Sequence, residues 1–212
     1  MSGLLFPEDF PSPVLDTIIG RRSTRTGFAR EPLSEGEVGR LIRAGNAAPS
    51  SKKSRPWRFH VLTTPTDREA IADLVRSKDE GGFIPRDNQS GLPHAGYVST
   101  VQESADTIAL APTSLVVENT SPFSGGRKQL STVGRTRLTD GLIGYGLEMI
   151  GIGAAIQNIL LEAEELGLGA VFIGDIQVAA AEIERLLSLS GDLVGIIAVG
   201  HNEGTTDRKP VS

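Results

Sequence analysis

Residues 48–59 read "APSSKKSRPWRF". Four cations (Lys52, Lys53, Arg55 and Arg58) stand in it without an acid, although the whole chain carries a formal net charge of −5. A Pro-Ser-Ser turn precedes the cations, and the alternating "WRFHVL" that follows them is typical of a strand. The stretch therefore predicts a basic loop that leads into a sheet.

The positive charge of this loop belongs to a wider segregation of charge. Between Arg21 and Arg58 there are ten Lys or Arg and three Glu, a balance of +7, so the rest of the chain carries −12. This pattern predicts a compact anionic ligand near the N-terminal third, with a solvated basic face as the alternative. The acidic total argues against a general nucleic-acid binder. The absence of cysteine excludes disulfides and thiolate catalysis and fits a reducing compartment, so we expect a cytoplasmic protein.

Hydrophobic periodicity and capping signals predict an α+β fold. Helices are expected at residues 12–23, 33–49, 66–77, 140–166 and 178–189, and strands at residues 57–62, 113–118, 170–176 and 193–201. Residues 79–103 and 120–139 lack a sustained period and are expected to be substrate or lid loops, and residues 203–212 a C-terminal tail. Neither a repeat nor a linker divides the chain. We therefore expect residues 1–212 to form one domain, with a mixed sheet of about four or five strands flanked by helices.

The apolar stretch at residues 141–160 is about long enough to span a bilayer. Glu148 stands in its middle, Gln157 and Asn158 follow, and five glycines lower its hydrophobicity. A buried helix of a soluble protein is therefore favoured, without a membrane partner. Gly151 and Gly153 half-resemble a dinucleotide-binding fingerprint, but they lie within a helical pattern and are interpreted as sites of close helix packing.

Several kinds of site are excluded by what the sequence lacks. The three histidines are scattered and there are no thiols, so no metal site is predicted. Neither a "GxSxG" elbow nor a P-loop occurs. What remains is "IIGRRSTRTGF" at residues 18–28, where Arg21, Arg22, Ser23 and Arg25 suit a phosphate because guanidinium groups form bidentate hydrogen bonds. A solvated surface is the alternative for this cluster too.

Taken together, these motifs resemble the nitroreductase family of FMN-dependent oxidoreductases. That family carries "RRSxRxF" and, after one helix, "APSxxNxQPWxF"; the counterparts here are "RRSTRTGF" and "APSSKKSRPWRF". The later "AIQNILLEAEELGLGAVFIGDI" and the closing "IIAVGHNEG", with an Arg a few residues on, are also similar. The resemblance covers residues 15–75, 106–119 and 140–209, about two-thirds of the chain.

The resemblance implies a nitroreductase-like fold and a cofactor site that needs no catalytic side chain, because the flavin carries the chemistry. It implies homodimers with flavin at the subunit interface, a glycine-rich dimer-core helix at residues 140–166, and the loop around Ser50 and Ser51 reaching the flavin of the partner chain. Lys209 is a further candidate for the phosphate. The residues that it assigns to FMN are Arg21, Arg22, Ser23, Arg25, Pro49, Ser50, Ser51, Lys53, Arg55, Ile173, Gly174 and Arg208.

The chain departs from the family pattern at Lys52, Lys53 and Arg55, where the family has Gly, Asn and Gln. In the family these amides hydrogen-bond the pyrimidine edge of the flavin. Cations there would stabilise an anionic reduced flavin and raise its potential. Weaker FMN binding, or recognition of an anionic substrate, are the alternatives.

The function that the resemblance implies is hydride transfer from NAD(P)H, through FMN, to an electron-poor acceptor such as a nitroaromatic or a quinone. A flavin-dependent dehydrogenase or oxidase of a biosynthetic intermediate is an alternative within the same fold. A flavin-binding protein without turnover is the alternative from another class. The predicted loops carry no motif that identifies the substrate.

Overall fold

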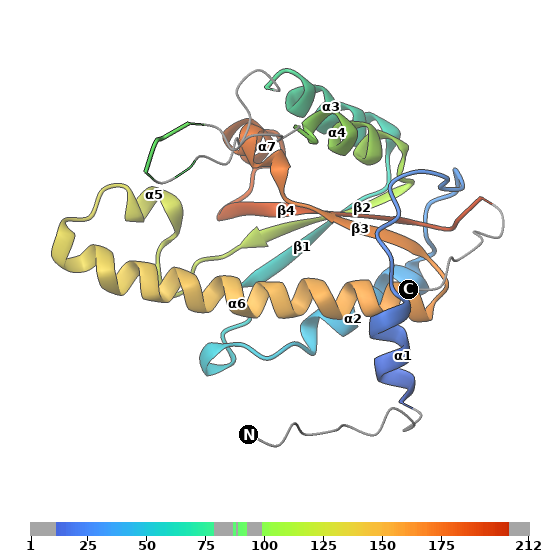
Figure 1. The fold of residues 1–212 in the computed structure, drawn as a ribbon, viewed down its shortest axis with the longest axis horizontal. Coiled ribbons are helices and arrows are strands. Elements are labelled where there is room, and N and C mark those ends of the chain that lie inside the picture. The colour runs from blue at the N-terminus through green and yellow to red at the C-terminus, as the bar shows by residue number, and fades with distance from the viewer. Residues whose placement is uncertain (1–11, 79–86, 88, 93–98, 204–212) are drawn as a thin grey trace.

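The computed structural model describes residues 12–78, 87, 89–92 and 99–203 (Figure 1). A four-stranded sheet lies between two layers of helices, with α3, α4 and α7 over one face and α2 and α6 over the other. The helices are α1 (Pro13–Gly20), α2 (Glu35–Asn46), α3 (Pro65–Arg76), α4 (Val101–Leu110), α5 (Gly126–Leu130), α6 (Arg135–Glu165) and α7 (Ala180–Leu186), with 3-10 turns η1 (Ser51–Lys53) and η2 (Asp175–Ala179). The strands are β1 (Trp57–Leu62), β2 (Thr113–Asn119), β3 (Gly169–Ile173) and β4 (Asp192–Gly200).

The sheet has the strand order β1-β2-β4-β3, and all three pairs of named strands are antiparallel. The prediction of a mixed sheet was therefore wrong for these strands. Parallel pairing among the described residues is limited to one bridge, between Ser23 and Ala170 at the outer edge of β3. Strand direction depends on how the chain crosses over between strands, and the sequence pattern of a single strand does not contain that information.

Side chains of the central strands alternate between two hydrophobic clusters, one on each face. Val116 and Ile196 pack with α3, α4 and α7, whereas Leu115 and Ile197 pack with α2 and α6. Every residue of β2 is buried. Because both faces are covered, β2 and β4 read as nearly continuous apolar runs rather than as clean alternations.

Most predicted elements are confirmed, including the capping box of Ser34 and Glu37 that begins α2. The prediction for residues 79–103 was wrong at its end, because α4 begins at Val101; the spacing of Val101, Ala105 and Ile108 gives this helix a buried face. Within residues 120–139, α5 forms and α6 begins. The rest of the first predicted loop that was expected to be a lid lies outside the described residues, apart from residues 87, 89–92, 99 and 100.

Helix α6 is the longest element, and in the described part of the chain its segment Arg137–Glu165 alone is long and apolar enough to cross a membrane. Core helices of soluble proteins meet the same criterion. Glu148, fully buried in the middle of α6, accepts hydrogen bonds from Asn119 Nδ2 (3.0 Å) and from the backbone N–H of Phe123 (2.7 Å). A carboxylate satisfied in this way ties one face of α6 to the end of β2. The prediction of a buried helix holds for this face only, because Leu142, Ile143, Leu147 and Ile150 are exposed.

Of the two glycines expected at close packing, only Gly151 has such a role. A Cβ at Gly151 would lie 3.4 Å from Ser50 Cβ and 3.5 Å from Trp57, so the neighbour is the basic loop rather than a second helix. A Cβ at Gly153 would meet nothing within 4 Å among the described residues.

Candidate functional site

The first candidate site lies along the outer edge of β3. Near the start of this strand, Ser23 bridges Ala170, and Thr24 N donates to Ala170 O (3.0 Å). Beyond this bridge, where β3 ends, a cavity of about 220 Å³ opens. It is lined by the N-terminal segment, by α4 with the residue before it, and by the end of β3: Arg25, Thr100, Glu103, Ser104, Val171, Phe172, Ile173, Gly174 and Asp175. Because an edge strand presents backbone N–H groups that no neighbouring strand uses, this edge offers donors to a ligand.

Asp175 gives the cavity a polar wall with spare capacity for hydrogen bonds. Its Oδ2 atom accepts from Thr100 Oγ1 (2.8 Å) and Ser104 Oγ (2.9 Å). Its Oδ1 atom is buried and has no hydrogen-bond partner in the described part of the protein. Buried polar atoms are normally paired, so this oxygen marks a place where a ligand N–H or a water would be bound.

Arg25 brings positive charge to the same cavity. Its Nε lies 3.6 Å from Glu103 Oε2, and both side chains are about half exposed (46% and 56%). An ion pair this exposed is worth at most about 1 kcal/mol, so an incoming phosphate could replace Glu103 as the partner of Arg25.

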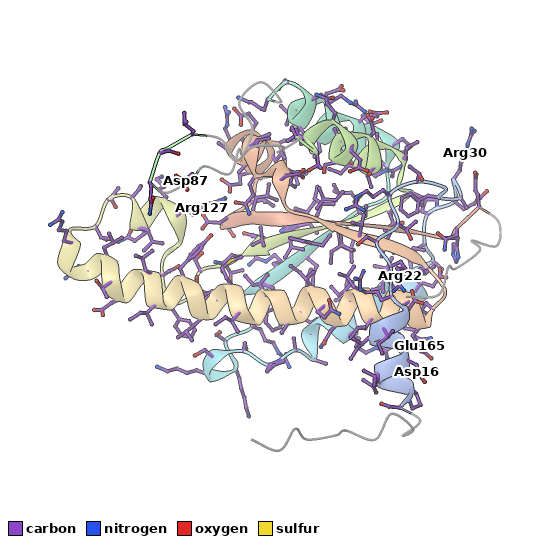
Figure 2. All side chains as sticks on the ribbon, in the orientation of Figure 1. Asp16, Arg22, Arg30, Asp87, Arg127 and Glu165 are labelled. Atoms are coloured by element: carbon purple, nitrogen blue, oxygen red, sulfur yellow. The ribbon has the colours of Figure 1, made fainter. Side chains whose placement is uncertain are left out.

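The other two arginines of the motif lie at the end of α1. Arg21 caps the helix by donating its N–H to Thr17 O (3.0 Å). The Nη1 of Arg22 donates to the carbonyls of Ile19 (2.6 Å), Gly20 (3.3 Å) and Arg21 (2.8 Å). Figure 2 shows Arg22 where α1 ends. The structure therefore places Arg25, and not Arg22, in the cavity.

The basic loop has an unusual backbone. Lys52, Lys53 and Arg55 have φ angles of 51°, 56° and 45°, in the left-handed region that non-glycine residues seldom adopt. Three hydrogen bonds hold this geometry: Lys53 N to Ser50 O (3.1 Å), Ser54 N to Ser51 O (3.0 Å) and Arg55 N to Ser50 Oγ (3.0 Å). The three cationic side chains are exposed, and within the described ranges none forms an ion pair. The fold thus holds a strained turn that presents cations to solvent.

This loop packs on α6 and not on the cavity beside β3. Trp57 anchors it by donating from Nε1 to Asn46 Oδ1 (2.9 Å), and Gly151 leaves room for Pro49 and Ser50. In Figure 1 the loop lies below α6, whereas β3 lies above it. Within one chain, therefore, the structure brings Arg25, Ile173 and Gly174 together and keeps residues 49–55 apart from them.

A second cavity of about 280 Å³ borders this loop. The Nζ of Lys52 lies 6.0 Å from the centroid of the Phe123 ring. The cavity is lined by Ser51, Lys52, Phe123, Asp140, Ile143, Gly144 and Leu147.

Sequence reasoning missed the acids of the first cavity and the aromatic wall of the second. Glu103 lies on α4, whose apolar spacing would have revealed the helix but not its neighbours. Phe123 lies in residues 120–139, which showed no hydrophobic period, and Asp140 follows that stretch directly. Arg208 and Lys209 lie outside the described residues. Over the described residues there is no group of three or more His, Cys, Asp or Glu that could hold a metal ion.

Known proteins share the sequence pattern of this chain. A family model described as "Nitroreductase family" matches residues 18–201, which include the arginine motif at residues 18–28, the basic loop and all four strands. The chain belongs to the nitroreductase family.

Individual relatives in this family are distant. A nitrobenzene nitroreductase of Ectopseudomonas oleovorans is 33% identical over 73 residues, which span 33% of this chain and only 32% of that protein. An NADPH-flavin oxidoreductase of Vibrio harveyi is 26% identical over 205 residues, or 92% of this chain and 68% of that protein. The chain thus matches about a third of the first relative's length.

Solved structures of nitroreductase-like proteins share the fold. The oxidoreductase YcnD of Bacillus subtilis superposes with a TM-score of 0.68 at 20% identity, covering 95% of this chain and 70% of that one. The NADPH:FMN oxidoreductase of Vibrio harveyi in complex with NAD+ gives a TM-score of 0.63 at 22% identity, covering 93% and 72%.

Proposed function

We propose that this protein is an FMN-dependent oxidoreductase that transfers a hydride from NAD(P)H, through the flavin, to an electron-poor acceptor such as a nitroaromatic or a quinone. Family membership and the names of the relatives support this proposal. The observation that carries it for this chain is the cavity that unites Arg25 with the open edge of β3 at Ile173 and Gly174.

The residues around this cavity fit FMN. Arg25, with Arg21 and the hydroxyl of Ser23 on the same segment, would hold the phosphate and the ribityl chain. Gly174 would offer its backbone N–H to the ring beside Ile173, which lines the cavity while pairing with Ile196 of β4, and the unpaired Asp175 Oδ1 would accept a donor from the ligand. When bound, the flavin supplies the hydride chemistry; this chain's residues bind and orient it and tune the charge around it.

The overall reaction needs no acid or base from the protein beyond proton exchange with solvent. For a nitro acceptor, NAD(P)H and one proton provide two electrons and two protons in total. The nitro group loses one oxygen as water and becomes a nitroso group, and NAD(P)+ is released.

We further propose that the complete site forms in a homodimer. The basic loop at residues 49–55 lies away from the cavity of its own chain, so a second copy would bring its Pro49, Ser50, Ser51, Lys53 and Arg55 to the flavin. Exposed apolar side chains on α1 and α6 support such an interface, because exposed apolar surface is typical of contacts between subunits: Val14, Ile18, Ile19, Leu142 and Ile150.

The remaining parts of the proposal concern domain organisation and location. We propose that residues 1–212 form a single FMN-binding domain, because both hydrophobic clusters pack on one sheet. We propose a cytoplasmic protein, supported by the absence of cysteine from the sequence.

An absorbance spectrum of the purified protein, with and without added FMN, tests the proposal. Bound FMN that NADPH or NADH bleaches and menadione reoxidises would support the reductase. Bound FMN that neither nicotinamide bleaches would favour a dehydrogenase, an oxidase or a flavin-binding protein without turnover. Protein that takes up no FMN would refute the flavin assignment.

A pair of variants tests the phosphate site. Arg25→Gln is expected to raise the Kd for FMN about tenfold, because it removes one charge-assisted contact with the phosphate. Arg30→Gln removes the same charge from an arginine that Figure 2 shows on the outside of the molecule and that does not line the cavity. Equal Kd values for the two variants would contradict the role of Arg25.

A further inference from the structure

We propose that the cavity between Lys52 and Phe123 binds the electron acceptor, and that Lys52 makes it select aromatic acceptors that carry an anionic group such as a carboxylate. The inference rests on the proposed function and names the class of substrate that this site takes. Three properties of the cavity support this proposal: its apolar walls, the contacts that hold these walls in place, and the charge of Lys52.

The walls suit a planar apolar ring. Phe123, Ile143 and Leu147 provide aromatic and aliphatic surface, and Gly144 also lines the cavity. The volume of about 280 Å³ is enough for a single substituted ring, since an apolar cavity of about 150 Å³ binds benzene.

The aromatic wall is held in place from behind. The buried carboxylate of Glu148 accepts the backbone N–H of Phe123 (2.7 Å) and both the N–H (2.9 Å) and the Oγ–H (2.7 Å) of Ser124. At Gly144 an added Cβ would lie 3.2 Å from Phe123 Cβ and 3.3 Å from its carbonyl oxygen, so the turn sits directly on α6. A wall held by these hydrogen bonds and contacts is preorganised, so a ligand need not order it on binding.

Among the described residues that line the cavity, Lys52 is the sole cation. The turn η1 holds its backbone at φ 51°, and its Nζ lies 6.0 Å from the centroid of the Phe123 ring. Asp140 also lines the cavity, yet among the described residues Lys52 has no carboxylate within 4.0 Å. The ammonium group is therefore available to an anion on the ligand, and the negative charge of Asp140 weakens that attraction.

The position of the cavity fits an acceptor site. Ser51 belongs both to its lining and to the loop proposed to lie along the flavin ring of the partner chain. An aromatic acceptor in the cavity would therefore lie beside the ring that delivers the hydride. For para-nitrobenzoate, NAD(P)H and a proton reduce the nitro group to a nitroso group with release of water, and the carboxylate stays unchanged beside Lys52.

The test compares para-nitrobenzoate with its neutral analogue nitrobenzene, using FMN-loaded protein. In Lys52→Met, the kcat/KM for para-nitrobenzoate divided by that for nitrobenzene should fall about tenfold, as expected from the loss of one charge-assisted hydrogen bond. Most of this change should come from a higher KM for para-nitrobenzoate. Lys128→Met, an exposed lysine on α5 with the same change of charge, is the matched control and should leave the ratio within about twofold. Asp140→Asn should raise the ratio.

Binding of unreactive benzoate, measured by calorimetry, provides a readout that does not need turnover. Its Kd should rise about tenfold in Lys52→Met and stay unchanged in Lys128→Met. An unchanged ratio and Kd in Lys52→Met, or equal changes in both lysine variants, would overturn the proposal. Because menadione reduction and the flavin spectrum are followed in every variant, failure of the proposed function itself would be seen separately, as wild-type protein without bound or reducible FMN.

Discussion

Replacing Glu148 by glutamine tests whether one buried carboxylate ties α6 to the turn that follows β2. Oε1 accepts the N–H groups of Phe123 and Ser124, whereas Oε2 accepts Asn119 Nδ2 (3.0 Å) and Ser124 Oγ (2.7 Å). If the amide oxygen of the introduced glutamine takes the place of Oε1, both backbone hydrogen bonds remain. The new NH2 group then faces Asn119 Nδ2, which is also a donor.

Asn119 cannot relieve this conflict by turning over, because its Oδ1 already accepts the N–H of Ser121 (2.8 Å). Both charge-assisted hydrogen bonds to Oε2 are lost: the Ser124 hydroxyl can turn to accept from the new NH2 group, but the Asn119 donor is left unpaired. The expected loss in the free energy of unfolding is about 2 kcal/mol. Urea denaturation at one protein concentration and saturating FMN measures it, since ligand and subunit concentration both shift apparent stability.

A compensating change at Asn119 tests the same hydrogen bond from its other side. Asn119→Asp alone places a second carboxylate beside Glu148 and should destabilise strongly, but combined with Glu148→Gln it restores a donor–acceptor pair with the roles exchanged. The two changes should therefore couple favourably by about 1–2 kcal/mol in a double-mutant cycle. A Glu148→Gln variant within about 0.5 kcal/mol of the wild type, or a cycle without coupling, would show that this contact does not hold the turn.

Three further predictions concern the flavin, the sheet and acid stability. Lys53→Asn should lower the two-electron flavin potential by about 20–30 mV, and potentiometry that finds no change would refute tuning by this cation. Gly195→Ala should lower the free energy of thermal unfolding by about 2–3 kcal/mol, because the new Cβ would lie 2.6 Å from Ile173 O. Gly39→Ala, with open space in α2, should raise it by up to about 1 kcal/mol, and the opposite order would contradict the packing. Glu118→Gln should cost about 2 kcal/mol near neutral pH and less in acid, and an unchanged loss at all pH values would argue against an ionised Glu118.

The sign of the last effect follows from the surroundings of Glu118. Burial raises the pKa of this carboxyl, but hydrogen bonds from His60, Ser190 and Gly191 together with the charge of Arg58 outweigh burial and lower the pKa below its ordinary value. A lowered folded pKa contributes stability that is complete above the unfolded value of about 4.3 and is lost as the pH falls through the folded pKa. The variant with glutamine at this position lacks this component, so the difference from the wild type should shrink on acidification.

Elements whose physical cause is local could be predicted from the amino-acid sequence. The capping box of Ser34 fixes where α2 begins, and the alternation of Trp57, Phe59 and Val61 marks β1. The order of the arginine-rich and Pro-Ser-Ser motifs was enough to identify the family, because these motifs are short, contiguous segments. One residue was enough to predict that α6 buries a face against the protein, since a carboxylate at position 148 is costly unless protein donors satisfy it.

How these segments meet depends on the packing of the folded chain. Strand direction is a property of pairs, so the antiparallel sheet could not be read from single strands. The meeting of Arg25 with Glu103 and Asp175 depends on α4 packing beside η2, far away in sequence. The basic loop of residues 48–59 first suggested a phosphate; packing on Gly151 turns it away from the arginines and places Lys52 beside Phe123. Contacts between distant segments depend on the shape of the whole core, and a local sequence pattern does not contain that information.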